Sequence, residues 1–238
     1  PRLVMDVRPQ VEDVCRRQIV TASFGDSFHE AYERMRRGDL RAIPVVDDDR
    51  RVVGVLSILT MMELFFTDAA DTTKARAVTT SLQKICDVLG GSFRNAIEPD
   101  RTDELLVMVG AMSAEGFMER MRNYPHERLV VVCGDRPSIQ LPAIDGRVRA
   151  IVITGGFPLA SEVVEIAKAK GVSVISSPFD TVNTTLRIKS SQIVDPVVER
   201  DVITVPGKLA VTEAREMVER SPQPRSEEHT SELQSRQY

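Results

Sequence analysis

The chain has 238 residues, which suits one large domain or two modest ones. Hydrophobic residues make up 42% and charged residues 28%, and these ordinary values exclude wholesale disorder. The formal net charge of -4 and the lack of a long basic run argue against nucleic acid as a partner, because phosphate binding needs clustered positive charge. Aromatic residues are only 5% of the chain, which argues against stacking platforms for single strands.

Location follows from apolar runs and cysteines. No run of about 18 apolar residues occurs, and no basic-then-apolar leader opens the chain, so we expect neither a membrane span nor secretion. Cys15, Cys86 and Cys133 are odd in number and far apart. They indicate reduced thiols in a cytoplasmic protein rather than a disulfide framework or a zinc site.

An internal repeat frames the chain. Residues 11–37 align without a gap with residues 194–220. Each copy predicts a short apolar strand, at Ile19-Val20 and at Val202-Ile203, then a polar turn and an amphipathic helix. The apolar helix faces comprise Phe28, Ala31, Tyr32 and Met35 in the first copy, and Val211, Ala214 and Val218 in the second.

After its helix, the first copy continues with two apolar runs and a further helix. Residues 41–46 and 52–57 flank Asp47-Asp48-Asp49 and predict a hairpin, and residues 61–66 predict a helix. The β-α-β-β-α unit resembles a CBS module, which we assign to residues 1–70. The acidic run could hold a metal ion, but we interpret it as an ordinary turn, because a metal site needs ligands from several elements.

The middle of the chain predicts a parallel α/β sheet with helices on both faces. Its apolar strands are expected at 105–109, 129–132, 150–153 and 172–175, and its helices at 113–121, 137–144, 159–170 and 180–189. A further helix is expected near residues 82–88, ending at Gly90-Gly91. Asp135-Arg136 and Thr154-Gly155-Gly156 match the motif of the DRTGG domain, and the resemblance covers residues 73–190. The predicted fold class is α/β, with α+β CBS modules flanking this sheet.

The second copy stops before its hairpin. The position equivalent to Arg41 falls at residue 224, so residues 193–224 form a truncated second CBS module. Residues 225–238 are polar and resemble translated sequencing adapter, so we expect a non-native, disordered tail there.

The order CBS, DRTGG, CBS is similar to the regulatory region of CBS-containing family II inorganic pyrophosphatases. The resemblance implies a non-catalytic regulatory fragment of a homodimeric hydrolase, whose manganese belongs to a catalytic domain missing from this chain. It also implies that AMP, ADP or ATP binds in the cleft between the two CBS modules. The expected nucleotide contacts are Val20, Thr21, Ala42, Ile43, Pro44, Ser57, Thr60, Ile203, Thr204 and Val205.

Two of these positions have distinct expected roles. Ser57 matches the family's hydroxyl near the phosphates, at a helix N-terminus that favours anions. Thr60 stands where the family often carries an aspartate for the ribose, and a threonine offers a weaker grip. For each apolar position taken singly, packing in the core is the better explanation, whereas for Ser57 packing and ligand binding are equally good explanations.

The DRTGG motif allows two interpretations. Asp135, Arg136, Thr154, Gly155 and Gly156 could form an anion site at the edge of the sheet. Alternatively, the glycines make a tight turn and an Asp135–Arg136 ion pair braces two loops. Two other functions therefore stay open. One is a small α/β enzyme with Asp135 as base, Arg136 as clamp and the glycines as anion cradle; the other is a dimerisation scaffold without ligand.

Overall fold

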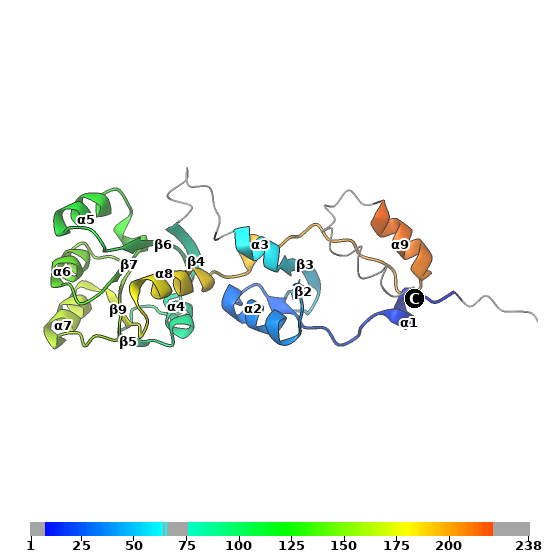
Figure 1. Cartoon of the computed structure of the whole chain (residues 1–238), viewed down its shortest axis with the longest axis horizontal. Coiled ribbons are helices and arrows are strands. Elements are labelled where there is room, and N and C mark those ends of the chain that lie inside the picture. The colour runs from blue at the N-terminus through cyan, green and yellow to red at the C-terminus, as the bar shows by residue number, and fades with distance from the viewer. Residues whose placement is uncertain (1–7, 64, 66–75, 221–238) are drawn as a thin grey trace, which may run out of the picture. The chain divides into compact units, whose positions relative to one another are not determined.

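The computed structural model describes residues 8–63, 65 and 76–220 (Figure 1). Backbone contacts divide the chain into two compact units, one of residues 1–19 and 201–238 and one of residues 20–200. Among the described residues, none of the helices combines the length and apolar character that crossing a membrane requires. The predicted tail at 225–238 lies outside the described residues.

Within the larger unit, the region predicted as a CBS module is a three-stranded sheet with helices, in the predicted order. Its strands lie in the order β1-β2-β3, with β1 parallel and β3 antiparallel to β2. The elements are β1 (Ala22–Ser23), α2 (Phe28–Arg37), β2 (Ala42–Val46), β3 (Val52–Ser57) and α3 (Ile58–Glu63). The apolar face of α2 packs against the strands, and the core contains Phe28, Ala31, Met35, Ile43, Val45 and Leu56. Tyr32, expected on the same face, is 43% exposed.

The predicted first strand of each copy is wrong. Ile19 and Val20 are 54% and 38% exposed and form no strand; β1 begins two residues later, where Ala22 is buried. Val202-Ile203 is likewise not a strand. Two apolar residues are too short a pattern to fix the register of a strand with one buried face.

The acidic hairpin turn closes on its own backbone. The Asp47 carboxylate accepts a hydrogen bond from the Arg51 amide at 2.8 Å, and the Arg50 amide donates to the Asp47 carbonyl at 2.9 Å. Arg50 has a φ of 62°. This geometry supports the interpretation of the aspartates as turn residues.

The region predicted as a DRTGG domain is a six-stranded sheet in the order β4-β6-β7-β8-β9-β5. The inner strands are parallel, as predicted, and each edge strand runs antiparallel to its neighbour. The strands are β4 (Ala77–Thr80), β5 (Ser92–Asn95), β6 (Asp103–Val109), β7 (Leu129–Cys133), β8 (Ala150–Ile153) and β9 (Ser173–Ser176). The edge strands β4 and β5 were not expected from the sequence.

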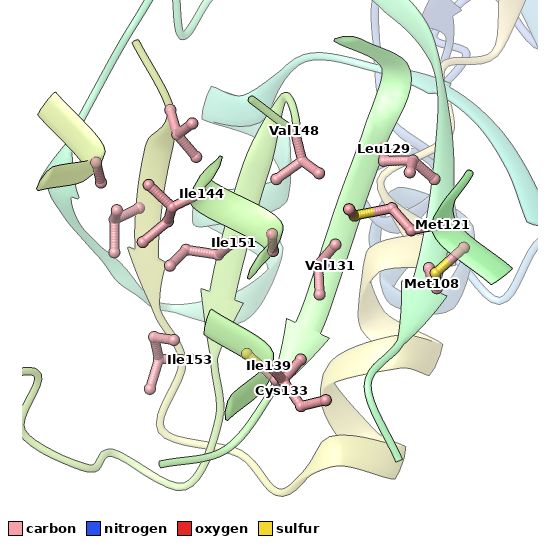
Figure 2. Packing of buried hydrophobic residues seen from close by; sticks show 14 of the residues in the cluster. Met108, Met121, Leu129, Val131, Cys133, Ile139, Ile144, Val148, Ile151 and Ile153 are labelled. Atoms are coloured by element: carbon pink, nitrogen blue, oxygen red, sulfur yellow. The ribbon is translucent and has the colours of Figure 1, made fainter. Parts of the chain in front are cut away.

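Helices cover both faces of this sheet (Figure 1). One face packs against α5 (Ala114–Met121), α6 (Pro137–Asp145) and α7 (Ser161–Lys170), and the other against α4 (Leu82–Leu89) and α8 (Thr181–Ser190). Figure 2 shows Met121, Ile139 and Ile144 from the first group of helices packed over Val131 and Ile151 of the strands. The helix α4 ends at Gly90 in the left-handed conformation, as expected.

The smaller unit joins α1 (Val11–Val14) to α9 (Val211–Glu219). The Val11 amide donates to the Leu209 carbonyl at 3.0 Å, and the Glu12 amide donates to the Gly207 carbonyl at 2.8 Å. The predicted apolar face of α9 is only partly covered, since Ala214 is buried whereas Val218 is 48% exposed.

Candidate functional site

The candidate nucleotide site lies where β2 begins and β3 ends. Ala42 pairs with Ser57 in the antiparallel register. Side chains alternate along a strand, so Ala42 and Pro44 lie on the opposite face from Ile43. Ala42 is exposed and Pro44 is half-buried, whereas Ile43 is fully buried in the core. Ile43 is therefore a packing residue, and only Ala42 and Pro44 are placed to offer apolar surface beside Ser57.

Ser57 and Thr60 form a pair of adjacent hydroxyls. The Ser57 Oγ accepts a hydrogen bond from the Thr60 amide at 3.0 Å and lies 2.8 Å from the Thr60 Oγ1. Ser57 thus caps the start of α3, which fixes its side chain. Both side chains are half-buried, so the expected phosphate and ribose positions lie together at one accessible place.

The residues on either side of β1 are held by an ion pair that was not predicted from the sequence. Arg34 on α2 forms an ion pair with Asp26, including a second hydrogen bond from Nη2 to Oδ1 at 3.2 Å. Its Nη1 also donates to the Thr21 carbonyl at 3.1 Å. The hydrogen bond to Asp26 raises the pKa of Arg34, so the brace stays charged. The sequence signal that could have predicted this pair is an aspartate just before the helix together with an arginine on the second turn of the helix.

The expected contribution of the second copy stays a prediction. Ile203, Thr204 and Val205 belong to the smaller unit, whereas Val20 and Thr21 belong to the larger one. Ile203 and Val205 are half-buried, and Thr204 is exposed.

In the DRTGG domain, the motif residues gather at the carboxyl edge of the parallel strands. Arg136 follows β7, and its guanidinium donates to the carbonyls of Gly110 and Met112, both at 3.1 Å. It therefore braces the loop after β6. The bracing role was expected, but the expected partner was wrong, because Arg136 donates to these carbonyls and Asp135 is exposed.

The Thr154-Gly155-Gly156 turn is closed by internal hydrogen bonds. The Gly155 amide donates to the Phe179 carbonyl at 2.7 Å, and the Gly156 amide donates to the Ser177 carbonyl at 2.9 Å. The glycines have φ values of 80° and 66°, which favour glycine. Both amides are engaged within the fold, so they do not form the expected anion cradle.

Thr154 is buried and extends the same network. Its amide donates to the Cys133 carbonyl at 2.9 Å, and its Oγ1 lies 3.2 Å from the Thr181 Oγ1 at the start of α8. The motif thereby ties the ends of β7, β8 and β9 together. Within the described ranges, no cluster of three or more histidine, cysteine, aspartate or glutamate residues could hold a metal ion.

Comparison with known families and proteins supports both domain assignments. The CBS domain family matches residues 11–66, and the DRTGG domain family matches residues 84–191. The chain is 30% identical over 201 residues to a cobalt-dependent inorganic pyrophosphatase from Clostridium perfringens (strain 13 / Type A). The match covers 84% of this chain and 36% of the relative, so the chain spans about a third of the curated relative's length.

A solved structure of a related regulatory region matches over most of this chain. It is the crystal structure of the CBS and DRTGG domains of the regulatory region of Clostridium perfringens pyrophosphatase, complexed with the activator diadenosine tetraphosphate. The two chains are 27% identical with a TM-score of 0.75, and the match covers 91% of this chain and 92% of the other.

Proposed function

We propose, because the chain carries CBS and DRTGG domains homologous to the regulatory region of a pyrophosphatase, that it senses adenine nucleotides and is itself non-catalytic. The observation that carries the proposal is the Ser57–Thr60 hydroxyl pair beside the outward face of Ala42 and Pro44. Apolar surface suits adenine, and hydroxyls suit the ribose and phosphates.

The ligand class follows from this chemistry and from the related structure. AMP, ADP and ATP share the adenosine group that such a surface takes up, and the related regulatory region binds a diadenosine polyphosphate. We infer that this chain binds the same class, with the Thr21 carbonyl held in place by Arg34. Ile203, Thr204 and Val205 of the smaller unit are proposed as further ligand contacts.

The parent is proposed to be a metal-dependent inorganic pyrophosphatase. Manganese is our proposal for its catalytic metal, whereas the Clostridium relative is named for cobalt. We also propose a homodimer, because apolar side chains on the CBS helices are exposed: Leu59 by 70%, and Met62 and Tyr32 by 43% each.

Titration calorimetry of Ser57→Ala with AMP, ADP, ATP and diadenosine tetraphosphate tests the proposal. Loss of one hydrogen bond to the ligand is expected to weaken binding about fivefold to tenfold. Ser113→Ala is the matched control, because Ser113 caps α5 in the same way, accepting from the Gly116 amide at 3.2 Å. Equal affinity of the two variants would contradict the site, and no binding to the unaltered chain would favour a ligand-free scaffold.

A further inference from the structure

Residues 191–200, here called the coupling segment, leave α8 and run along the CBS module. The Phe28 amide donates to the Gln192 carbonyl at 2.8 Å, and the Val194 amide donates to the Asp26 carbonyl at 2.9 Å. Further along, Val55 and Glu199 exchange both backbone hydrogen bonds, at 2.9 and 3.0 Å. The segment therefore pairs with the start of α2 and with the open edge of β3.

Side chains of the coupling segment complete the core of the module. Val194 is fully buried in the cluster that contains Phe28 and Leu56. Arg200 lies over the Phe24 ring, 5.1 Å from its centroid, and forms an ion pair with Asp195 at 2.6 Å. The module is thus built from two stretches of sequence more than a hundred residues apart.

Gly54 makes this close approach possible. A Cβ atom at Gly54 would lie 2.2 Å from the Val198 Cγ1 and 2.5 Å from the Glu199 carbonyl oxygen. Real Cβ atoms do not approach backbone so closely, so any side chain at this position must push the segment off β3.

The other end of the coupling segment is fixed to the DRTGG domain. The Thr79 amide donates to the Gln192 Oε1 at 2.8 Å, and the Ile193 amide donates to the Thr79 carbonyl at 2.9 Å. The Thr80 hydroxyl donates to the Ser191 carbonyl at 2.8 Å. Gln192 is 3% exposed and Thr80 is fully buried, so this junction with β4 is water-excluded.

We propose that the coupling segment transmits the state of the CBS module to the DRTGG domain. Ser57 lies at the end of β3, two residues after the Val55–Glu199 pair, so displacement of β3 by a ligand is carried along the segment to Gln192 and β4. The ligand part of this proposal rests on the proposed nucleotide function; the mechanical link between Gly54 and β4 does not.

The first test is hydrogen exchange of the full chain without ligand. Gly54→Ala is expected to speed exchange about tenfold or more at residues 193–199 and also at β4, because both depend on the seated segment. Gly25→Ala is the matched control, since a Cβ there meets nothing within 4 Å. Unchanged exchange at β4 in Gly54→Ala, with faster exchange at 193–199, would overturn the link.

A second variant guards against simple misfolding of Gly54→Ala. Thr80→Val keeps the side-chain shape and removes only the hydroxyl that donates to Ser191. Thr185→Val removes a comparable hydroxyl, which donates to the Thr181 carbonyl within α8 at 2.7 Å, and serves as control. Thr80→Val is expected to speed exchange about tenfold at residues 24–28 of the module. Protection there equal to that of the control would count against the link.

Hydrogen exchange with added nucleotide then distinguishes the proposed nucleotide-sensing function from the proposed link between the CBS module and the DRTGG domain. With AMP or diadenosine tetraphosphate bound, protection of β4 is expected to change in the unaltered chain and not in Thr80→Val, while the Kd of both proteins stays the same. Failure of both proteins to bind would refute the proposed function, and the ligand-free exchange would still decide the link. Equal ligand-induced changes at β4 would refute the link alone.

Discussion

Single residues determine the backbone conformation at the carboxyl edge of the parallel strands in the DRTGG domain. Gly155 shows this most directly, because its φ of 80° disfavours side chains and its position faces the Phe157 ring. A Cβ at Gly155 would lie 2.6 Å from the Phe157 Cε2. The motif therefore uses glycine for backbone geometry, with its amides turned inward to carbonyls.

Comparison of Gly155→Ala with Gly171→Ala separates the strain from the clash. Gly171 has a φ of 72°, but a Cβ there meets nothing within 4 Å. We expect Gly171→Ala to cost about 1 kcal/mol of unfolding free energy and Gly155→Ala about 1–2 kcal/mol more, limited by movement of the half-exposed Phe157 ring. Denaturant unfolding measures both, and equal costs would show that the ring moves freely.

Residue-scale chemistry was only partly predictable. Ser57 was predicted as a nucleotide contact because it matches the hydroxyl position of the family that the chain resembles, and its place before a helix is visible in the local sequence. The roles of Arg136 and Gly155 depend on carbonyls of Gly110 and Phe179, which other strands bring close. A sequence indicates that a glycine turn is present, but it does not say which distant carbonyl its amide meets.

At the scale of elements, the start of α2 couples helix capping to charge. The Ser27 amide donates to the Glu30 carboxylate at 2.7 Å, the Glu30 amide donates to the Ser27 hydroxyl at 3.2 Å, and Lys84 lies 3.4 Å from the carboxylate. Burial alone would raise the pKa of Glu30. The hydrogen bonds from Ser27 and the charge of Lys84 outweigh it, so the pKa lies below its ordinary value of 4.5.

This capping box predicts a pH dependence of stability. Because the folded-state pKa is lowered, the contribution of Glu30 is full above the unfolded value of 4.5 and is lost as the pH falls through the folded value. Glu30→Gln is expected to lower stability at pH 7 by less than about 1 kcal/mol, because the side chain is half-exposed, and to flatten the acid limb. Thermal unfolding measured between about pH 3 and 7, the range over which carboxylates titrate, checks this prediction. A Glu30→Gln curve parallel to that of the unaltered chain would contradict it, with Glu119→Gln on α5 as control.

Elements were predicted where their own pattern was strong. The inner strands β6 to β9 each contain a continuous apolar run that is buried on both faces, and the helices between them have clear apolar positions. The edge strands β4 and β5 are short and carry polar residues such as Thr79 and Arg94, so they are defined by their neighbours. Ile19-Val20 shows the reverse error, in which an apolar pair stays exposed because no strand pairs with it.

At the scale of the whole molecule, the CBS module of the larger unit is not formed from one continuous stretch of sequence. The CBS family match ends at residue 66, yet Val194 completes the core of that module. Long-range pairing of this kind leaves no periodic signal, so the domain order was predictable and the coupling segment was not. Its consequence is that residues 11–66 alone lack part of their own core.

At the scale of the whole molecule, the reactivity of the buried cysteines reports how often the fold opens. Burial raises the pKa of the Cys133 thiol to about 12 and also raises that of Cys86, whereas Cys15 is exposed. Since only the thiolate reacts, a pulse of alkylating reagent is expected to label Cys15 about a thousandfold or more faster than the buried pair, which react only when the fold opens. Mass spectrometry after timed pulses measures this, and equal rates for Cys15 and Cys133 would contradict it.

Cys133, on β7, lies in the cluster that α5, α6 and α7 cover, and Cys86, on α4, lies in the cluster between the opposite face of the sheet and the helices α4 and α8. Each face of the central sheet therefore carries one buried thiol, whose labelling rate reports how often that face is exposed. Equal labelling rates for Cys86 and Cys133 would mean that both layers of helices open together, and unequal rates would identify the layer that opens more often.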